Sequence, residues 1–305
     1  MRIGYVILSH RDWEQVAWQA KILRLLDPDA TVVISHDRRD LEGFQRISEL
    51  EDVSVQARAG GRADFSAIER WLDAVQLLDE LGGVDFVILL SGQDHLVRHP
   101  DAIKDELQAS GDGRMEYFDV SSPEAPWGER EGRSRYHYAW RSLVPLSDAW
   151  AWRLHAIHAL NRVQPWFRLN VAYGSLRVGR LVGPPPSPLR TIYGGSQWHA
   201  LSWRAVQRVR GLVATRPDSV ERGHRSLVSD ESFIQTIVMN DANLHIQQGA
   251  ARYFDFSDAH FGHPKTLDLS DLDAIVASNA WFARKMDWHA SHDLIRALDR
   301  RLGVG

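Results

Sequence analysis

The alternation of apolar strands and amphipathic helices in the first ninety residues constrains the fold more than any other feature. Apolar runs of strand length occupy residues 3–8, 31–35 and 84–90, while residues 13–26 and 65–81 carry apolar side chains at helical spacing. Strand–helix–strand order requires crossover connections, which are right-handed and produce a parallel sheet covered by helices. Ligands bind at the carboxyl ends of the strands in such a sheet. The sequence therefore predicts an α/β fold with a nucleotide-sized crevice at that edge.

Two polar motifs suggest that the chain is an enzyme. The buried strand Val84–Leu90 runs directly into Ser91-Gly92-Gln93-Asp94, so polar groups follow the strand at the edge where a ligand would bind. Far downstream, the doublet Asp230-Glu231 opens an amphipathic segment, with Ser229 or Asp230 expected as its N-cap. A carboxylate at a helix start is more often a cap than a catalyst, so the doublet alone leaves both roles open.

Composition excludes several classes of protein. The 305 residues are 44% hydrophobic and 25% charged, enough to bury a large core and too apolar for a disordered chain. Cysteine is absent, which removes disulfides, thiolate metal sites and cysteine nucleophiles. A net charge of −4 and a pI near 6.4 argue against a nucleic-acid partner. We expect no transmembrane segment, and we interpret Met1–Leu8 as a first strand, not a signal peptide.

The middle of the chain is rich in tryptophan and arginine. Residues 127–203 contain seven of the twelve tryptophans, and a helix is expected near Leu146 to Val163. Most of these rings are expected to pack in the core. The alternative is a carbohydrate-facing surface, because aromatic rings stack on sugars and neighbouring arginines donate hydrogen bonds.

The C-terminal region concentrates lysine. Two of the four lysines in the chain, Lys265 and Lys285, lie there, and Lys285 follows Arg284 within an aromatic stretch. The Arg284-Lys285 pair is either a solvated edge or two cations directed at a diphosphate.

Four motifs together resemble one family. Ser91-Gly92-Gln93-Asp94, Gly194-Gly195-Ser196-Gln197-Trp198, Ser229-Asp230-Glu231-Ser232-Phe233 and Phe282-Ala283-Arg284-Lys285 occur in the order seen in glycosyltransferase family 14. That family contains the core-2/I-branching β-1,6-N-acetylglucosaminyltransferases and the peptide O-xylosyltransferases. The resemblance runs from about Ile3 to Asp287 and is weakest between Glu124 and Arg190. It implies a GT-A-type, Rossmann-like fold with a mixed, mostly parallel central sheet flanked by helices.

The resemblance also implies roles for individual residues. Glu231 matches the catalytic base of the family, which would take the proton of an acceptor hydroxyl. The remaining implied sites are the donor diphosphate contacts Arg284, Lys285 and Lys265, the nucleotide contacts His10, Asp37 and Arg62, and the sugar or acceptor side formed by Asp94, Gln197 and Trp198.

The implied reaction uses neither a metal nor another cofactor. The slot that usually holds a metal-binding Asp-x-Asp reads Ser-Gly-Gln-Asp here, and the literal Asp-x-Asp triplets at 27–29 and 271–273 fall on a turn and on an expected helix. We therefore expect an inverting, metal-independent transferase that moves GlcNAc or xylose from a UDP-sugar to a glycan, lipid-linked glycan, peptide or small-molecule acceptor. The alternatives are a catalytically silent carbohydrate-binding protein and a metal-dependent GT-A transferase.

The expected organisation is one GT-A-like catalytic domain over residues 1–305. Residues 1–120 would form the nucleotide-binding half and residues 121–305 the acceptor-binding and catalytic half, with a variable aromatic-rich insertion around 127–190. Since the sequence lacks the cysteines, stem and anchor of animal members, we expect a bacterial, cytoplasmic protein that associates with membranes peripherally at most.

Overall fold

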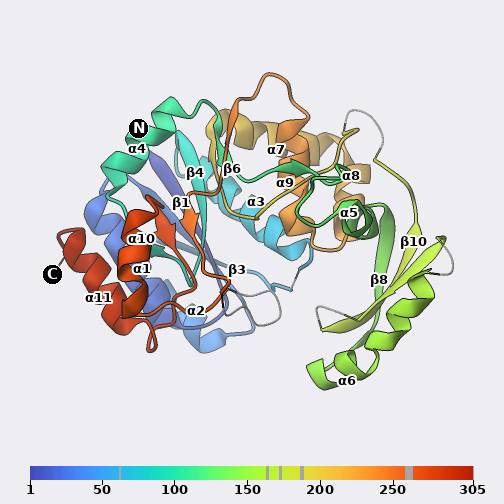
Figure 1. Ribbon diagram of the computed structural model, residues 1–305. Helices are drawn as coiled ribbons and strands as arrows, with labels where there is room; N and C mark the ends of the chain where they lie inside the picture. The colour runs from blue at the N-terminus through green and yellow to red at the C-terminus, as the bar shows by residue number, and fades with distance from the viewer. Residues whose placement is uncertain (62, 163–164, 172–173, 186–188, 258–263, 305) are drawn as a thin grey trace.

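A mixed seven-stranded sheet forms the centre of the protein in the computed structural model, which describes residues 1–61, 63–162, 165–171, 174–185, 189–257 and 264–304 (Figure 1). Its strand order is β13-β6-β12-β4-β1-β2-β3. All neighbours pair in parallel except around β12, which is antiparallel to both β4 and β6. This confirms the predicted mixed, mostly parallel sheet. The strands are β1 (Ile3–Ser9), β2 (Thr31–His36), β3 (Ser54–Ala57), β4 (Phe86–Ser91), β6 (Gly113–Met115), β12 (His199–Ser202) and β13 (Ile246–Gln248).

Helices cover both faces of the sheet, and the alternation of side chains along the strands explains how. On β1, Val6 packs into one apolar cluster while Tyr5 and Ile7 pack into another on the opposite face. The first cluster is completed by α3 (Ser66–Glu80), α7 (Trp203–Thr215) and α9 (Phe233–Met239), and the second by α1 (Trp13–Leu26), α2 (Leu41–Ser48) and α4 (Pro100–Ala109). Strands buried on both faces are continuously apolar, which is why these runs were readable in the sequence.

A small C-terminal unit lies beside the sheet. Its three strands are β5 (His95–Leu96), β14 (Arg252–Tyr253) and β15 (Phe282–Ala283), with β15 in the middle. The 3₁₀ turn η3 (Leu269–Asp271) and the helices α10 (Leu272–Ala277) and α11 (His292–Arg301) pack around a separate apolar cluster. Because β14 and β15 pair directly, Arg252 and Arg284 are brought close to each other.

The aromatic-rich region extends away from the body as a small antiparallel sheet (Figure 1). We call residues 138–182 the arm; it contains β8 (Tyr138–Pro145), α6 (Asp148–Arg153), the 3₁₀ segment η1 (His155–Arg162), β9 (Phe167–Asn170) and β10 (Ser175–Leu181). Its strands are ordered β8-β10-β9. The segment α5 (Glu129–Tyr136) precedes the arm, the short strands β7 (Phe118–Asp119) and β11 (Tyr193–Gly194) pair on the body, and α8 (Pro217–His224) follows α7.

Two local expectations were wrong. The single helix expected near Leu146 to Val163 is replaced by the short α6 and the 3₁₀ segment η1, since the exposed rings on α6 bury too little surface to stabilise a longer helix. Neither Ser229 nor Asp230 caps α9: the doublet lies in η2 (Ser229–Glu231), and Ser232 interrupts helical geometry with a φ of −148° before α9 begins.

The division into halves at residue 120 remains a prediction. Each helix in the described part of the chain is too short or too polar to cross a bilayer.

Candidate functional site

The carboxyl ends of β1, β2 and β4 lie side by side and form the floor of the candidate site. Leu8 is in register with Ser35 on one side and with Ser91 on the other. The residues that follow these strands are His10, Asp37 and the loop 91–94, so three of the predicted positions reach the same edge. The backbone fixes them further, because Asp37 N–H donates to the Ser9 carbonyl at 2.9 Å.

Asp37 is held rigidly by hydrogen bonds. Its carboxylate accepts from the backbone N–H of Arg39 at 3.0 Å, from Arg39 Nε at 2.9 Å and from the N–H of Gly60 at 3.1 Å. Burial raises the pKa of Asp37, but these hydrogen bonds outweigh it and keep the pKa well below its usual range. Asp37 is therefore ionised at neutral pH and is held at the end of β2, paired with Arg39.

Arg70 lies beneath this edge and was not identified from the sequence. It comes from the buried face of α3, donates to the Ser9 carbonyl at 2.7 Å and to the Ser35 hydroxyl at 3.1 Å, and also contacts the Ser35 carbonyl. Burial lowers its pKa to about 10, so it stays charged at neutral pH. Its signal in the sequence is weak: Arg70 lies four positions before the buried Ala74 and therefore shares the buried side of the helix.

A buried cluster of one carboxylate and two arginines lies beside the loop 91–94. Asp94 is fully buried, accepts from the Ser91 N–H at 2.8 Å, and lies 3.6 Å from Nε of both Arg252 and Arg284. Both guanidinium groups stack on the ring of Trp198, at 5.0 and 4.2 Å from its centroid. The structure therefore brings the predicted residues Asp94, Trp198 and Arg284 together and adds Arg252, which sequence reasoning missed.

Positive charge exceeds negative charge in this cluster. In the described part of the chain, Asp94 is the one carboxylate that pairs with Arg252 or Arg284. Lys285 adjoins Arg284, and no carboxylate of a described residue lies within ion-pair distance of its ammonium. Burial, then the charges of Arg11 and Arg284, lower the pKa of Lys285, and burial lowers the pKa of Arg252 to about 10. Cations whose charged forms are disfavoured in this way gain stability from an anionic ligand.

Lys265 is placed differently from the other two predicted diphosphate cations. Its ammonium lies 2.8 Å from a carboxylate oxygen of Asp271 and 3.3 Å from one of Asp255. Those partners raise its pKa, the hydrogen bond to Asp271 most. Its contact with a phosphate stays a prediction. Arg62, the third predicted nucleotide contact, falls outside the described residues.

Glu231 lies in the turn η2 and contacts the loop before β12. Its carbonyl accepts from the Gly195 N–H at 2.9 Å, and its carboxylate lies 3.3 Å from the guanidinium of Arg135. Burial raises the pKa of Glu231, although Arg135 opposes the rise. Burial and the neighbouring Glu231 also raise the pKa of Asp230, to about 7. Both carboxyl groups of the doublet therefore have raised pKa values, as is common at functional sites.

The motif 194–198 joins the two sides of the site. Gln235 donates to the Ser196 carbonyl at 2.8 Å, which anchors the loop to α9. The predicted Gln197 is partly exposed, and its carbonyl contacts the ring of the buried His199 at 2.9 Å. Trp198, at the other end of the loop, reaches the arginine cluster. The loop therefore links the Glu231 turn to Arg284.

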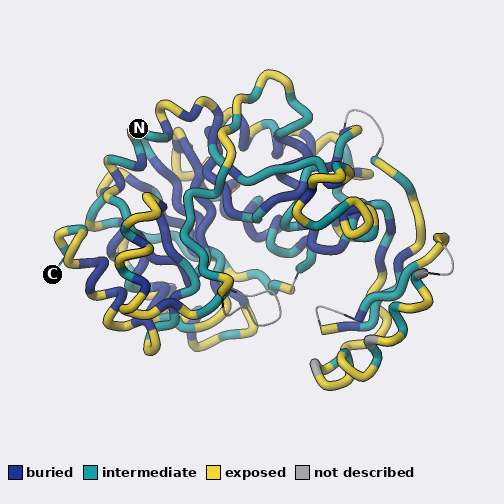
Figure 2. Tube along the Cα trace, viewed as in Figure 1, coloured by how far each residue is buried: buried dark blue, intermediate teal, exposed yellow. Residues whose placement is uncertain are grey.

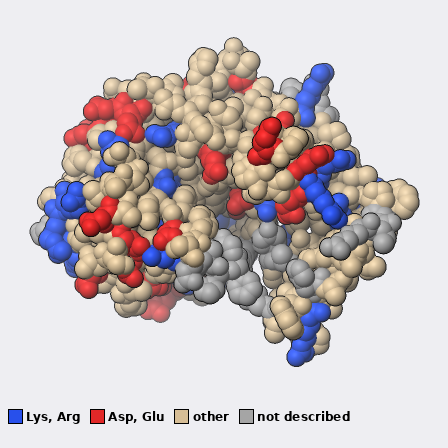
Figure 3. Space-filling view, in the orientation of Figure 1, with Lys and Arg blue, Asp and Glu red and all other residues tan. Residues whose placement is uncertain are grey.

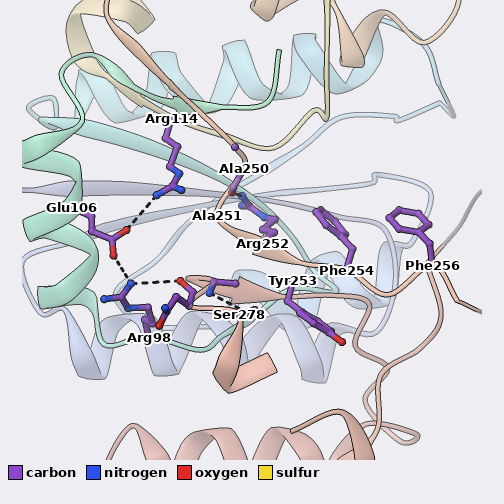
Figure 4. Close-up of a pocket in the computed structure, with 13 residues that line it drawn as sticks. Arg98, Glu106, Arg114, Ala250, Ala251, Arg252, Tyr253, Phe254, Phe256 and Ser278 are labelled. Atoms are coloured by element: carbon purple, nitrogen blue, oxygen red, sulfur yellow. Dashed lines mark hydrogen bonds and ion pairs between the residues drawn. The ribbon is translucent and has the colours of Figure 1, made fainter. Parts of the chain in front are cut away.

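A hollow of about 740 Å³ adjoins the cluster, since Arg252 is among its lining residues (Figure 4). Glu106 lies between Arg98 and Arg114 there, 3.4 Å from Arg114, and accepts from Trp281 Nε1 at 2.7 Å. The carboxylate offsets part of the positive charge that the arginines bring to the hollow.

No group of three His, Asp or Glu side chains that could hold a metal ion occurs among the residues with described positions. The expectation of a metal-free reaction is a separate statement about chemistry and stays a prediction.

Comparison with known proteins gives matches only among solved structures. No family model matches the chain, and neither does any curated protein sequence. A protein assigned as a glucose-1-phosphate thymidylyltransferase from Bacillus anthracis, in complex with sucrose, is similar at 11% identity with a TM-score of 0.38, covering 91% of this chain and 95% of that one. A 4-diphosphocytidyl-2C-methyl-D-erythritol synthase from Anaerococcus prevotii is similar at 7% identity with a TM-score of 0.40, covering 92% and 95%.

These comparisons correct the expected activity. The first protein is named as a thymidylyltransferase and the second as a synthase, and neither is named as a glycosyltransferase. The interpretation as an inverting UDP-sugar glycosyltransferase, with GlcNAc or xylose as the transferred sugar, is contradicted by these matches, and we do not carry it further. The resemblance of the four motifs to family 14 is not tested by these matches and stays a prediction.

Proposed function

We propose that the chain is a nucleotide-dependent transferase that binds a nucleoside phosphate at the carboxyl edge of its sheet. The nucleoside would lie against His10 and Asp37, and the phosphates against Arg284 and Lys285. The single observation that carries this proposal is the excess of cations beside the loop 91–94. One buried carboxylate serves the buried side chain of Arg252 and the partly exposed side chain of Arg284, and Lys285 adjoins Arg284.

A phosphate group satisfies this arrangement on physical grounds. Buried charge without a counter-ion is costly, and an anion with several oxygens would accept from Arg284 and Lys285 at once. Arg252 adds positive charge nearby, although its guanidinium already donates to two backbone carbonyls. Arg284 is already oriented by the Trp198 ring, 4.2 Å away, so little side-chain entropy is lost on binding. Positive charge fixed at this point would also stabilise the negative charge that develops on a departing phosphate.

Glu231 and Trp198 define the side of the site for the second substrate. The hydrogen bond from the Gly195 N–H to the Glu231 backbone carbonyl joins the Glu231 turn to the loop that carries Trp198. We propose that the acceptor binds there, with Glu231 accepting a hydrogen bond from one of its polar groups. Gln197, which is partly exposed on the same loop, is placed to contact it.

Calorimetric titration with UDP, CDP, dTDP and GDP, each with and without EDTA, tests the proposal. We expect one or more nucleotides to bind the wild type and Arg284→Ala to weaken that binding by at least about tenfold, since a charged hydrogen bond contributes about 1.5–3 kcal/mol. Lys285→Ala should weaken binding in the same direction. Lys21→Ala is the matched control, because Lys21 is exposed on α1 over the Trp18 ring.

The first reaction to assay is nucleotidyl transfer to a sugar phosphate, because one of the compared proteins is named as a glucose-1-phosphate thymidylyltransferase. The readout is pyrophosphate released from a nucleoside triphosphate when a sugar 1-phosphate is added. Failure of every nucleotide to bind the folded wild type would refute the proposed site. Binding without pyrophosphate release would keep the site and exclude this reaction.

A further inference from the structure

The arm carries most of the exposed large hydrophobic side chains in the described part of the chain. Of fourteen large hydrophobic side chains that are exposed in the described residues, nine lie on it. Trp152 is 81% exposed and Trp166 is 68% exposed. Figure 2 shows the arm as mostly exposed, in contrast to the buried strands of the body. The nine residues are Leu143, Val144, Trp150, Trp152, Leu160, Trp166, Phe167, Leu181 and Val182.

The arm is also strongly cationic within an acidic protein. Residues 138–182 contain six arginines and a single acidic residue, whereas the whole chain has a net charge of −4. Three of these arginines, Arg141, Arg153 and Arg180, are exposed. The tip of the arm shows basic and uncharged atoms but no acidic ones in the view of Figure 3.

Strand register separates an outer face of the arm from a face fixed to the body. Arg141 pairs with Val178, and Arg180 pairs with both Ala139 and Phe167, so Arg141, Arg180 and Phe167 share one face of the small sheet. The alternate residues Tyr138 and Trp140 are buried with residues 227 and 228 of the body. The face that carries the exposed arginines is therefore directed away from that attachment.

We propose that the arm docks on an anionic lipid bilayer. Tryptophan side chains partition to the interface between headgroups and acyl chains, and arginine side chains add attraction to anionic headgroups. The arm presents both together: on α6, the guanidinium of Arg153 lies 5.3 Å from the ring centroid of Trp150. This inference rests on the arm alone and does not depend on the proposed transferase activity.

Charge and side-chain type favour a bilayer over the other occupants of such a face. Two copies of an arm with five net positive charges would repel each other. Single-stranded nucleic acid would use the arginines and aromatic rings, but not the exposed aliphatic side chains Leu143, Val144 and Leu160. An anionic bilayer accommodates all three kinds of side chain, because aliphatic groups enter the acyl chains, aromatic rings lie at the interface and arginines contact the headgroups.

Vesicle co-sedimentation of the full chain tests the proposal. We expect the wild type to sediment with vesicles of phosphatidylglycerol and phosphatidylcholine in equal parts, and much less with phosphatidylcholine alone. Binding should fall as salt is raised, because screening weakens attraction to the charged surface.

Two variants separate the apolar and electrostatic contributions. Trp150→Ala with Trp152→Ala should reduce the partition coefficient by about tenfold or more, and Arg141→Ser with Arg180→Ser by about fivefold for each arginine. The matched controls are Leu41→Ala, a 69% exposed residue on α2, and Arg300→Ser on α11, both outside the arm. These exposed substitutions leave the packing of the arm unchanged, which circular dichroism would verify.

Several outcomes would overturn the inference. One is a wild type that fails to sediment with either vesicle, and another is a double tryptophan variant that sediments as well as the controls. If the wild type does not bind vesicles, and light scattering shows a dimer that the tryptophan substitutions convert to a monomer, the face would be assigned to self-association. Retention on single-stranded RNA without vesicle binding would assign it to nucleic acid.

Discussion

Asp94→Asn is the most informative perturbation of the buried cluster. Asparagine has the same shape as aspartate but carries no charge, so Arg252 and Arg284 would remain buried without a counter-ion. Each Asp94–arginine pair is separated by 3.6 Å, which at an effective dielectric constant of about 20 corresponds to about 4–5 kcal/mol of attraction. Part of this loss is offset because the variant no longer buries a carboxylate. Removal of one partner from a buried ion pair therefore costs about 3–5 kcal/mol.

For a chain of 305 residues, that loss lowers the thermal midpoint by about 5–8 °C. Differential scanning calorimetry in low salt at pH 7 gives the measurement. The control is Asp105→Asn, an exposed position on α4, which should shift the midpoint by less than about 1 °C. A change at Asp94 as small as that of the control would refute the reasoning that this carboxylate holds the arginines.

A second readout separates structural from ligand-binding roles. The variant leaves Arg252, Arg284 and Lys285 uncompensated, so a nucleoside diphosphate should raise its thermal midpoint more than it raises that of the wild type. An equal rise in both proteins would show that the phosphates bind away from this cluster.

Two further substitutions test the turn that carries Glu231. Asp230 has a folded-state pKa of about 7, above the unfolded value, so ionisation of the unfolded chain reduces stability as pH rises from about 4 to about 7 and the loss then levels off. Because the pKa is raised by about three units, each equivalent to about 1.4 kcal/mol, Asp230→Asn should stabilise the protein by about 4 kcal/mol more at pH 8 than at pH 4 in urea unfolding. A pH-independent effect would contradict the assigned pKa. Gly195→Ala places a methyl group 2.0 Å from the Glu116 carbonyl oxygen, so it should lower the free energy of unfolding by at least about 2 kcal/mol and also reduce turnover. The control Gly211→Ala meets open space on α7 and should raise the free energy of unfolding by up to about 1 kcal/mol. Equal thermal midpoints for the two variants would exclude the clash.

The sheet was predictable because its strands are buried on both faces. Val84–Leu90 reads as one apolar run, and β4 occupies Phe86–Ser91. The end of α1 at Leu26 was marked in the same way by Asp27-Pro28. Patterns of this kind depend on burial and on turn-forming residues, and both can be recognised from residues that are consecutive in the sequence.

The site was predictable only in part because its contacts are between distant segments. Arg252 and Asp94 are 158 positions apart, and nothing near Arg252 in sequence shows that its guanidinium is buried against Asp94 and Trp198. The cap expected at Ser229 failed for a related reason: Val228 adopts a left-handed backbone with a φ of +51°, held where its N–H donates to the Ala63 carbonyl at 3.1 Å. A β-branched residue takes that conformation only when tertiary contacts impose it.

The reversed direction of β12 determines which segments of the chain can meet a ligand. In a wholly parallel sheet, the ligand edge receives only the loops that follow strands, and the loops that precede them lie at the opposite end. Because β12 runs against β4, the loop that precedes it, residues 194–198, arrives at the same edge as the loop 91–94 that follows β4. The antiparallel direction of β12 therefore lets the second half of the chain contribute the loop 194–198 to the site. The length and sequence of this loop can vary without changing the parallel strands β1, β2 and β4 beneath the ligand.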